Sequence, residues 1–260
     1  SLEFESLAIC LIHSYVDSTH EQRISALINE EFGDDLYVTC SSEILPEISE
    51  YDRTSTTVVN AYIGPSVAKY IASLVGRLTE YGISAPLEII QSNGGAMTAA
   101  AAIRKPASIV ESGPAAGVIA AARTAKLTGQ ENAISFDMGG TTTKVAMIEN
   151  GEPVKTNEYE VGAGINHSSM LVKGGGYPIK LPLIDVSEIG AGGGSIISVD
   201  DLQSVRVGPQ SAGSMPGPAC YDLGGEKATL TDALIVLGYL NPNYLVGGSL
   251  ALNAEKSTKV

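Results

Sequence analysis

Residues 136–144 read Phe136-Asp137-Met138-Gly139-Gly140-Thr141-Thr142-Thr143-Lys144, and no other segment constrains the fold as strongly. An apolar strand ends at an acidic residue, two glycines follow, and three threonines lead into a second strand. Glycine permits positive φ in a narrow turn, and successive backbone N–H groups in such a turn form a concave site for anions. Threonine hydroxyls add donors without negative charge. We therefore interpret the segment as a phosphate-binding hairpin, in preference to a plain hairpin with a Gly-Gly corner.

Asp137 is the acidic residue of this hairpin. A carboxylate repels a phosphate placed directly against it, so Asp137 is expected to hold Mg²⁺ or one of its waters. Mg²⁺ commonly takes one or two carboxylates from the protein and its other ligands from water and substrate phosphates. The hairpin thus predicts a nucleotide site with Mg²⁺ as the metal.

Charge and composition exclude other classes of protein. The chain has 16 Lys and Arg residues and 29 Asp and Glu residues, which gives a net charge of -13, and the cations do not cluster in the sequence. Binding along nucleic acid or on an anionic membrane requires clustered cations, so neither partner is expected. Three scattered cysteines indicate neither a disulfide framework nor a zinc site, and favour a reducing cytoplasm.

The alternation of apolar and polar residues predicts two regions of an α/β protein. Residues 1–129 alternate strands and helices, including a long helix over 53–82 with an interruption expected at Gly64-Pro65. Residues 130–260 form a second region with a β-meander that carries the hairpin, a glycine-rich loop, and a helix over 229–240 capped by Thr229 or Thr231. The residues at both termini suggest a chain truncated at each end.

The hairpin motif resembles the phosphate hairpin of the actin, Hsp70 and sugar-kinase superfamily. Three further stretches read Gln91-Ser-Asn-Gly-Gly-Ala-Met97, Glu111-Ser-Gly-Pro-Ala-Ala-Gly-Val118, and Gly190-Ala-Gly-Gly-Gly-Ser195 continuing to Pro216-Gly-Pro-Ala-Cys-Tyr221. Together, in this order, the four motifs resemble the hydantoinase A and 5-oxoprolinase family. The resemblance implies actin/Hsp70/sugar-kinase-like (ribonuclease H-like) lobes, incomplete here, of which residues 1–129 and 130–260 are parts. It also implies that residues 137–143 are the second of two phosphate hairpins.

Two more segments are candidate ligand sites. Gly190 to Ser195 follows a strand, and glycines there let the backbone approach a ligand closely, which we favour over a plain tight corner. Ser112 and Gly113 open a helix whose free N–H groups receive an anion or, equally, are capped by the Ser112 side chain. The candidate nucleotide-binding residues are Gly139, Gly140, Thr141, Thr142, Thr143, Lys144, Gly192, Gly193, Gly194, Ser195, Ser112 and Gly113.

Asp185 is the second candidate for catalysis and metal binding, beside Asp137. It lies at the end of an apolar strand just before the glycine-rich loop, and we favour a ligand role over a turn role. The family resemblance places a histidine two residues later, where this chain has Ser187. Serine is a poor ligand for transition metals, which argues against a metal beyond Mg²⁺. The resemblance also places Asp where this chain has Lys144, and a lysine there pairs with phosphate instead of metal.

The resemblance implies a function for the protein to which the chain belongs. It is expected to open a cyclic amide such as a hydantoin or 5-oxoproline with ATP hydrolysis, together with a hydantoinase B-type subunit. One alternative is an ATP-dependent ketone carboxylase subunit, which acts on a carbonyl substrate through the same phosphoryl-transfer residues. Another is a non-catalytic nucleotide-binding or scaffold module. The 260 residues alone are expected to be inactive, because the first phosphate hairpin is missing.

Overall fold

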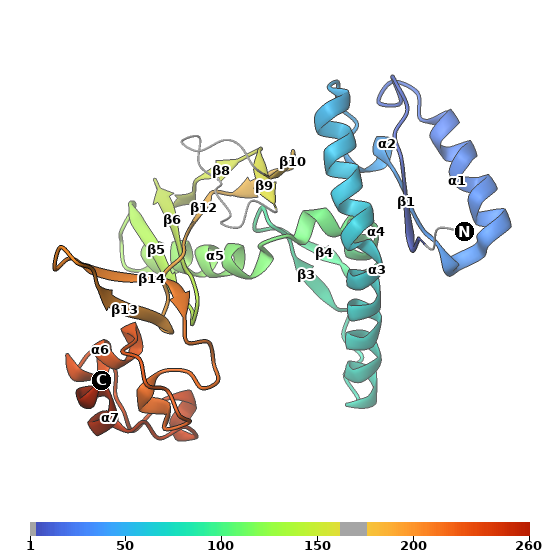
Figure 1. Cartoon of the computed structure of the whole chain (residues 1–260). Helices are drawn as coiled ribbons and strands as arrows, with labels where there is room; N and C mark the ends of the chain where they lie inside the picture. Colours follow the sequence, from blue (N-terminus) through green and yellow to red (C-terminus); the bar gives the residue numbers. More distant parts are fainter. Residues whose placement is uncertain (1–3, 162–175) are drawn as a thin grey trace. The chain divides into compact units, whose positions relative to one another are not determined.

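The computed structural model describes residues 4–161 and 176–260 (Figure 1). The chain forms a mixed α/β structure, as the sequence predicts, and packs as two compact units. Unit 1 comprises Ser1–Ile134 and Ala146–Val186, and unit 2 comprises Ser135–Val145 and Ser187–Val260. These boundaries differ from the expected division after residue 129, because residues 146–186 pack with the N-terminal part of the chain. Most of the glycine-rich stretch around residues 162–175 lies outside the described residues.

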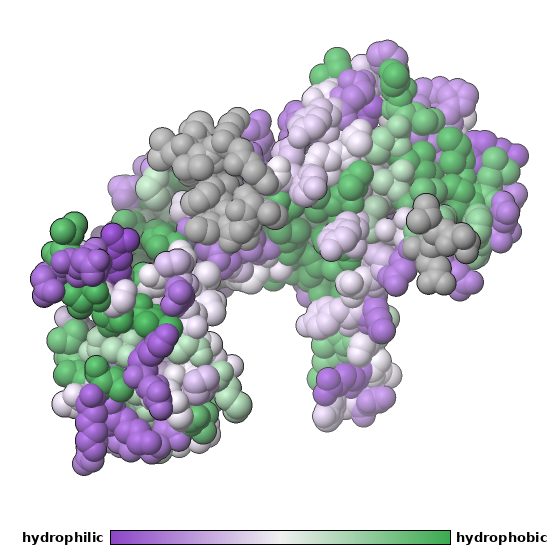
Figure 2. All heavy atoms as spheres, viewed as in Figure 1, coloured by the Kyte–Doolittle hydropathy of each residue, from purple (hydrophilic) through white to green (hydrophobic). Residues whose placement is uncertain are grey.

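Unit 1 begins with a strand–helix–strand arrangement. Strand β1 (Ser6–Ile9) pairs in parallel with β2 (Tyr37–Cys40), and helix α1 (Thr19–Phe32) connects them. This alternation agrees with the sequence prediction. Helix α1 buries Glu21 and leaves apolar side chains of its outer face exposed, among them Leu27 and Phe32. Figure 2 shows hydrophobic residues on the visible surface over these first elements of unit 1.

Helix α3 (Glu50–Glu80) runs without the interruption that the sequence suggested at Pro65. The helix is packed on both sides of the proline, with Ala61 and Ile71 buried. Gly64 supports this packing, because a Cβ there would lie 2.3 Å from the ring of Tyr37. Burial of the flanking turns outweighs the hydrogen bond that a proline removes from a helix interior.

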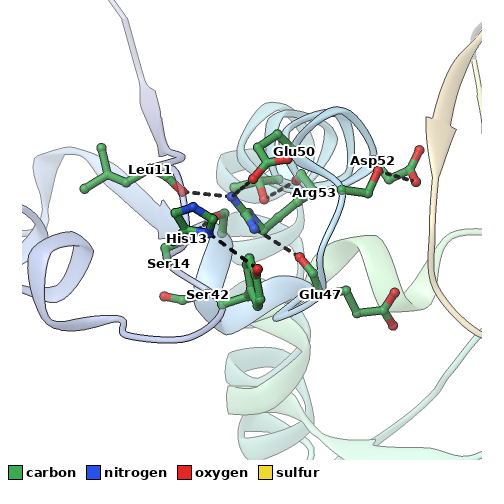
Figure 3. A network of polar contacts seen from close by, with 12 residues as sticks. Leu11, His13, Ser14, Ser42, Glu47, Glu50, Asp52 and Arg53 are labelled. Atoms are coloured by element: carbon green, nitrogen blue, oxygen red, sulfur yellow. Dashed lines mark hydrogen bonds and ion pairs between the residues drawn. The ribbon is translucent and has the colours of Figure 1, made fainter.

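Buried polar contacts hold the first turn of α3 against the loop after β1 (Figure 3). The Arg53 guanidinium, 1% exposed, donates to the carbonyl oxygens of Glu47 at 3.0 Å and Leu11 at 2.8 Å. The N–H of Leu11 donates in turn to the buried Glu21 carboxylate at 2.8 Å. Burial alone raises the pKa of Glu21, but hydrogen bonds from Ser41 and from backbone N–H groups outweigh it and lower this pKa. The peptide groups of Leu11 therefore lie between a buried anion and a buried cation.

A second part of unit 1 is built on helix α5 (Ser112–Leu127). Its apolar face packs against β6 (Thr143–Glu149) and the strands near residue 185. The buried core of this part is Ala115, Val118, Ala122, Ala146, Ile148, Ile184 and Val186. The other helices and strands are α2 (Ser41–Ile44), β3 (Glu88–Ile90), β4 (Ala96–Thr98), α4 (Ala99–Arg104), β7 (Glu152–Pro153), β8 (Lys155–Thr156), β9 (Tyr159–Val161), β10 (Tyr177–Ile179) and β11 (Leu183–Ile184).

Strands β5 (Ala133–Met138), β6 and β12 (Val186–Ile189) have residues in both units. They form a sheet of order β12-β6-β5, and β7 pairs antiparallel with β6. The meander predicted after residue 130 is therefore present. The pairing of β12 beside β6 brings the glycine-rich loop that follows β12 next to the turn between β5 and β6.

Unit 2 contains the antiparallel hairpin of β13 (Ser195–Val199) and β14 (Val205–Ser211) and the helices α6 (Leu230–Val236) and α7 (Ala254–Lys259). Cys220, Ile235 and Leu252 form its buried apolar cluster. Thr229 caps α6 in a capping box with Asp232, which settles the choice between Thr229 and Thr231. The helix ends at Val236, earlier than predicted, because Gly238 takes a positive φ of 77° and the chain turns away.

Among the helices that the structure describes, none combines the length and the apolar character needed to cross a lipid bilayer.

Candidate phosphate-binding site

The predicted phosphate hairpin is a tight turn at the end of β5. The N–H of Gly139 donates to the carbonyl oxygen of Thr142 at 2.9 Å, which closes the turn between β5 and β6. Asp137 precedes the turn and is exposed. Neither Gly139 nor Gly140 takes positive φ, so the expected reason for the two glycines is wrong.

Three consecutive amides of the turn have no acceptor among the residues that the structure describes. Within residues 4–161 and 176–260, the backbone N–H groups of Gly140, Thr141 and Thr142 donate no hydrogen bond. A Cβ built on Gly140 would meet no atom within 4 Å, and its φ is not one that disfavours a side chain. The fold itself therefore does not require glycine at position 140. A glycine with open space above it, beside unengaged amides, is suited to the close approach of an anion.

The glycine-rich loop after β12 packs directly on this turn. The N–H of Gly193 donates to the carbonyl oxygen of Gly139 at 2.9 Å, and that of Gly194 donates to Gly140 at 2.6 Å. The N–H of Gly192 donates to the Ser195 hydroxyl at 2.8 Å, and that of Ser195 returns to the Gly192 carbonyl at 2.9 Å. All four amides that the sequence assigned to a ligand are thus engaged within the protein.

Glycine is required in this loop because its main chain packs directly against the main chain of the turn at residues 139–141. A Cβ on Gly192 would lie 2.7 Å from the carbonyl oxygen of Gly139 and 2.7 Å from the backbone nitrogen of Thr141. A Cβ on Gly194 would lie 2.9 Å from the carbonyl oxygen of Gly140. The loop lets the main chain support the turn from one side, a role that differs from the ligand contact predicted for it.

Thr143 and Lys144 also belong to this support. Thr143 is buried, and its hydroxyl donates to the carbonyl oxygen of Ala191 at 2.5 Å. Lys144 lies 3.9 Å from the carboxylate of Glu188, and both side chains are largely buried. Of the three threonines, Thr141 is exposed and Thr142 is half-buried, so their hydroxyls remain the accessible ones.

The remaining candidate residues lie in unit 1. Asp185 is half-buried between β11 and β12, and its N–H donates to the carbonyl oxygen of Val154 at 2.9 Å. Ser112 is the first residue of α5, and the cap position is taken by Glu111 at φ 60°, without a side-chain cap. Capping by the Ser112 side chain, one of the two predicted readings, is therefore wrong. Gly113 is exposed in the first turn.

Asp137 and Asp185, the two predicted metal ligands, belong to different units. No group of three or more His, Cys, Asp or Glu side chains able to hold a metal occurs in the described part of the chain. A single exposed carboxylate is compatible with Mg²⁺ whose other ligands come from water and a nucleotide. A cavity of about 580 Å³ in unit 1, lined by Glu5, Tyr37 and Pro65 among others, contacts none of the candidate site residues.

Sequence reasoning missed two residues that the structure brings to the hairpin. Glu188 pairs with Lys144, and Thr231 hydrogen-bonds the carbonyl oxygen of Gly193 at 2.8 Å. No local pattern marks Glu188. The sequence predicted Thr229 or Thr231 as the cap of this helix, but nothing in it showed that the helix starts beside the glycine-rich loop.

The fold and the site together define a mixed α/β protein in which a glycine–threonine turn presents unengaged amides beside an exposed aspartate. The chain belongs to the hydantoinase/oxoprolinase family, whose model matches residues 53–260. This match confirms the resemblance that the four sequence motifs indicated.

Relatives match almost the whole chain. An uncharacterized protein of Methanocaldococcus jannaschii is 44% identical over 99% of this chain and 37% of its own length. The caprolactamase subunit alpha of Pseudomonas jessenii is 38% identical over 97% of this chain and 34% of its own length. The chain therefore spans about a third of the length of these curated relatives.

Two solved structures share the fold. The crystal structure of ATP-dependent caprolactamase from Pseudomonas jessenii superimposes with a TM-score of 0.72 at 36% identity, covering 98% of this chain and 35% of its own. A nucleotide-free structure of acetone carboxylase, described as a study of ATP-dependent acetone carboxylation, gives a TM-score of 0.73 at 29% identity, covering 98% and 34%.

Proposed function

We propose that this chain carries a nucleotide-phosphate site of an ATP-dependent hydrolase that opens a cyclic amide. The observation that carries the proposal is the run of three unengaged amides at Gly140, Thr141 and Thr142, beside the exposed Asp137. The ATP-dependent caprolactamase of similar fold supports this reaction class, since caprolactam is a cyclic amide. We further propose that the two units are parts of actin/Hsp70/sugar-kinase-like lobes.

The residues of the turn would act by electrostatics. Backbone N–H groups fixed before the reaction stabilise charge that develops on a phosphoryl group without reorganising at that moment. The amides of residues 140–142 would bind phosphate oxygens, and the hydroxyls of Thr141 and Thr142 would add donors. Asp137 would hold Mg²⁺ through its carboxylate. Phosphorylation of the amide carbonyl oxygen by ATP would make the carbonyl carbon more open to attack by water.

We assign the other candidate residues by their contacts. Gly192, Gly193, Gly194, Ser195 and Thr143 support the turn, because their donors are engaged with it or with each other. The ammonium group of Lys144 lies 3.9 Å from the Glu188 carboxylate, and its positive charge offsets the negative charge of Glu188 beside the hairpin.

Asp185 is the proposed second acid of the reaction, and the first turn of α5 at Ser112 and Gly113 is a proposed second anion site. Both belong to unit 1. Helix N-termini bind anions through free N–H groups and the positive end of the helix dipole.

A companion subunit is part of the proposal. The caprolactamase relative is named as an alpha subunit, and a relative in Aromatoleum aromaticum is named as the gamma subunit of acetophenone carboxylase. We propose a partner of the hydantoinase B type.

Carboxylation of a ketone is the second candidate reaction. The fold shared with acetone carboxylase favours it, because the same turn would serve phosphoryl transfer to an enolate oxygen.

The test is ADP release by the full-length polypeptide with its companion subunit. The assay compares hydantoin, 5-oxoproline and caprolactam with acetone plus bicarbonate. Release that depends on a cyclic amide supports the first candidate, and release that requires ketone and bicarbonate supports the second. Release that is independent of every added carbonyl compound contradicts both and favours a nucleotide-binding scaffold.

A further inference from the structure

The first turn of α6 is fastened to the glycine-rich loop by one residue. The backbone N–H of Thr231 and its hydroxyl both donate to the carbonyl oxygen of Gly193, each at 2.8 Å. Thr231 is 7% exposed, so both hydrogen bonds are protected from water. A Cβ on Gly193 would lie 2.8 Å from the Thr231 hydroxyl, which shows how closely the two backbones approach.

The same loop is hydrogen-bonded to the phosphate hairpin. The N–H of Gly193 donates to the carbonyl oxygen of Gly139, and the N–H of Gly194 donates to that of Gly140. The carbonyl of Gly139 belongs to the same peptide group as the N–H of Gly140, and the carbonyl of Gly140 to the same peptide group as the N–H of Thr141. Because a peptide group is planar, fixing its carbonyl oxygen also fixes the direction of its N–H.

The start of α6 is itself held firmly. Asp232, 1% exposed, accepts hydrogen bonds from the backbone N–H groups of Ala219, Cys220 and Thr229 and from the hydroxyls of Thr229 and Ser257. This carboxylate closes the cap of α6 at Thr229 and ties two other segments of unit 2, at residues 219–220 and at Ser257, to the helix. A hydrogen-bonded path therefore leads from a rigid helix start, through Gly193, to the turn.

We propose that Thr231 is a positioning residue for the phosphate hairpin. It acts by holding Gly193 so that the amides of Gly140 and Thr141 point in a fixed direction before phosphate arrives. The inference rests on the proposed function insofar as that function makes the hairpin the phosphate site. A loop that must be ordered on binding loses affinity, so loosening Gly193 weakens phosphate binding.

The test uses two substitutions at Thr231 and one control. Thr231→Val removes the hydroxyl and keeps the branched shape, whereas Thr231→Ser restores the hydroxyl. Ser257→Ala is the matched control. Ser257 is 6% exposed in the same unit, and its hydroxyl donates to Asp232 at 2.9 Å without contacting the loop. Asp232 keeps its four other hydrogen bonds when this hydroxyl is removed, so the start of α6 remains held. If Thr231→Val does not fold, Thr231→Ala removes the same hydroxyl without added bulk.

The first readout is amide hydrogen exchange of the nucleotide-free 260-residue chain. Thr231→Val is expected to speed exchange of the hydrogen-bonded amides of Gly139, Gly193 and Gly194 by about 3- to 10-fold, the range of one neutral hydrogen bond. Thr231→Ser and Ser257→Ala leave these amides within about 2-fold of the unchanged chain. Equal acceleration in Thr231→Val and Ser257→Ala would show a purely structural hydroxyl and overturn the inference.

The second readout is the MgADP affinity of the full-length polypeptide. Thr231→Val is expected to weaken it by about 3- to 10-fold with rescue by Thr231→Ser, while Ser257→Ala leaves it unchanged. An unchanged affinity in Thr231→Val overturns the positioning role. Failure of the unsubstituted polypeptide to bind MgADP contradicts the proposed function instead, and the exchange experiment, which needs no nucleotide, still decides the role of Thr231.

Discussion

Gly192→Ala is expected to destabilise the protein although it adds only one methyl group, because Gly192 is buried against the hairpin. The new Cβ would lie 2.7 Å from the Gly139 carbonyl oxygen and from the Thr141 backbone nitrogen. Both are backbone atoms, so no side-chain rotation relieves the contact, and the loop or the turn must shift. Overpacking of this kind costs about 1–3 kcal/mol.

Gly190→Ala is the matched control for this substitution. It lies in the same loop, a Cβ there would meet no atom within 4 Å, and neither glycine has positive φ. Urea denaturation is expected to give a free energy of unfolding about 1–3 kcal/mol lower for Gly192→Ala and within about 0.5 kcal/mol of the parent for Gly190→Ala. Equal free energies for the two variants would refute the argument that backbone contact with the hairpin dictates glycine at position 192.

Three further predictions address the hairpin, the long helix and the buried acid. Gly140→Ala is expected to change the unfolding free energy by less than about 0.5 kcal/mol and to weaken MgADP binding about 10-fold, because only a ligand needs the open space there; calorimetry beside denaturation checks both. Gly64→Ala places a methyl group against the Tyr37 ring and is expected to lower Tm, whereas Gly76→Ala, with open space around it, is expected to raise the unfolding free energy by about 0.5–1 kcal/mol. Thermal denaturation should therefore give Tm changes of opposite sign for the two variants, and equal changes would contradict the prediction. Burial alone raises the pKa of Asp232, but the hydrogen bonds to its carboxylate outweigh burial and lower this pKa below the ordinary 3.8. The carboxylate therefore stabilises the fold fully above about pH 5, and this stabilisation is lost as pH falls through the folded-state pKa. Asp232→Asn is expected to flatten the acid side of a plot of unfolding free energy against pH, and an unchanged slope would argue against this linkage.

Local signals in the sequence were sufficient for most of the fold. The alternation of strands and helices predicted over residues 1–129 includes the β1–α1–β2 arrangement, and a helix capped by Thr229 or Thr231 was predicted where α6 begins, because strand patterns and caps depend on neighbouring residues. The break expected at Pro65 was wrong, since tertiary packing of Gly64 on Tyr37 holds the helix together and no local pattern reveals it.

The candidate site was predicted in part. The position of the turn and the exposure of Asp137 follow from the motif itself. The role of Gly192 could not be read from the sequence, because a glycine needed for a ligand and a glycine needed for a neighbouring backbone look identical. Thr231 and Gly193 are far apart in the chain, and their hydrogen bonds exist only because α6 begins beside the loop.

The central claim is that the turn amides bind a phosphoryl group, and nuclear magnetic resonance tests it most directly. MgADP is titrated into the ¹⁵N-labelled full-length polypeptide while the amide signals of Gly140, Thr141 and Thr142 are followed. These three signals are expected to move until binding saturates, while the amide signal of Gly139, already hydrogen-bonded to the Thr142 carbonyl, moves less. Saturable binding of MgADP that leaves the three turn amides unmoved would contradict it.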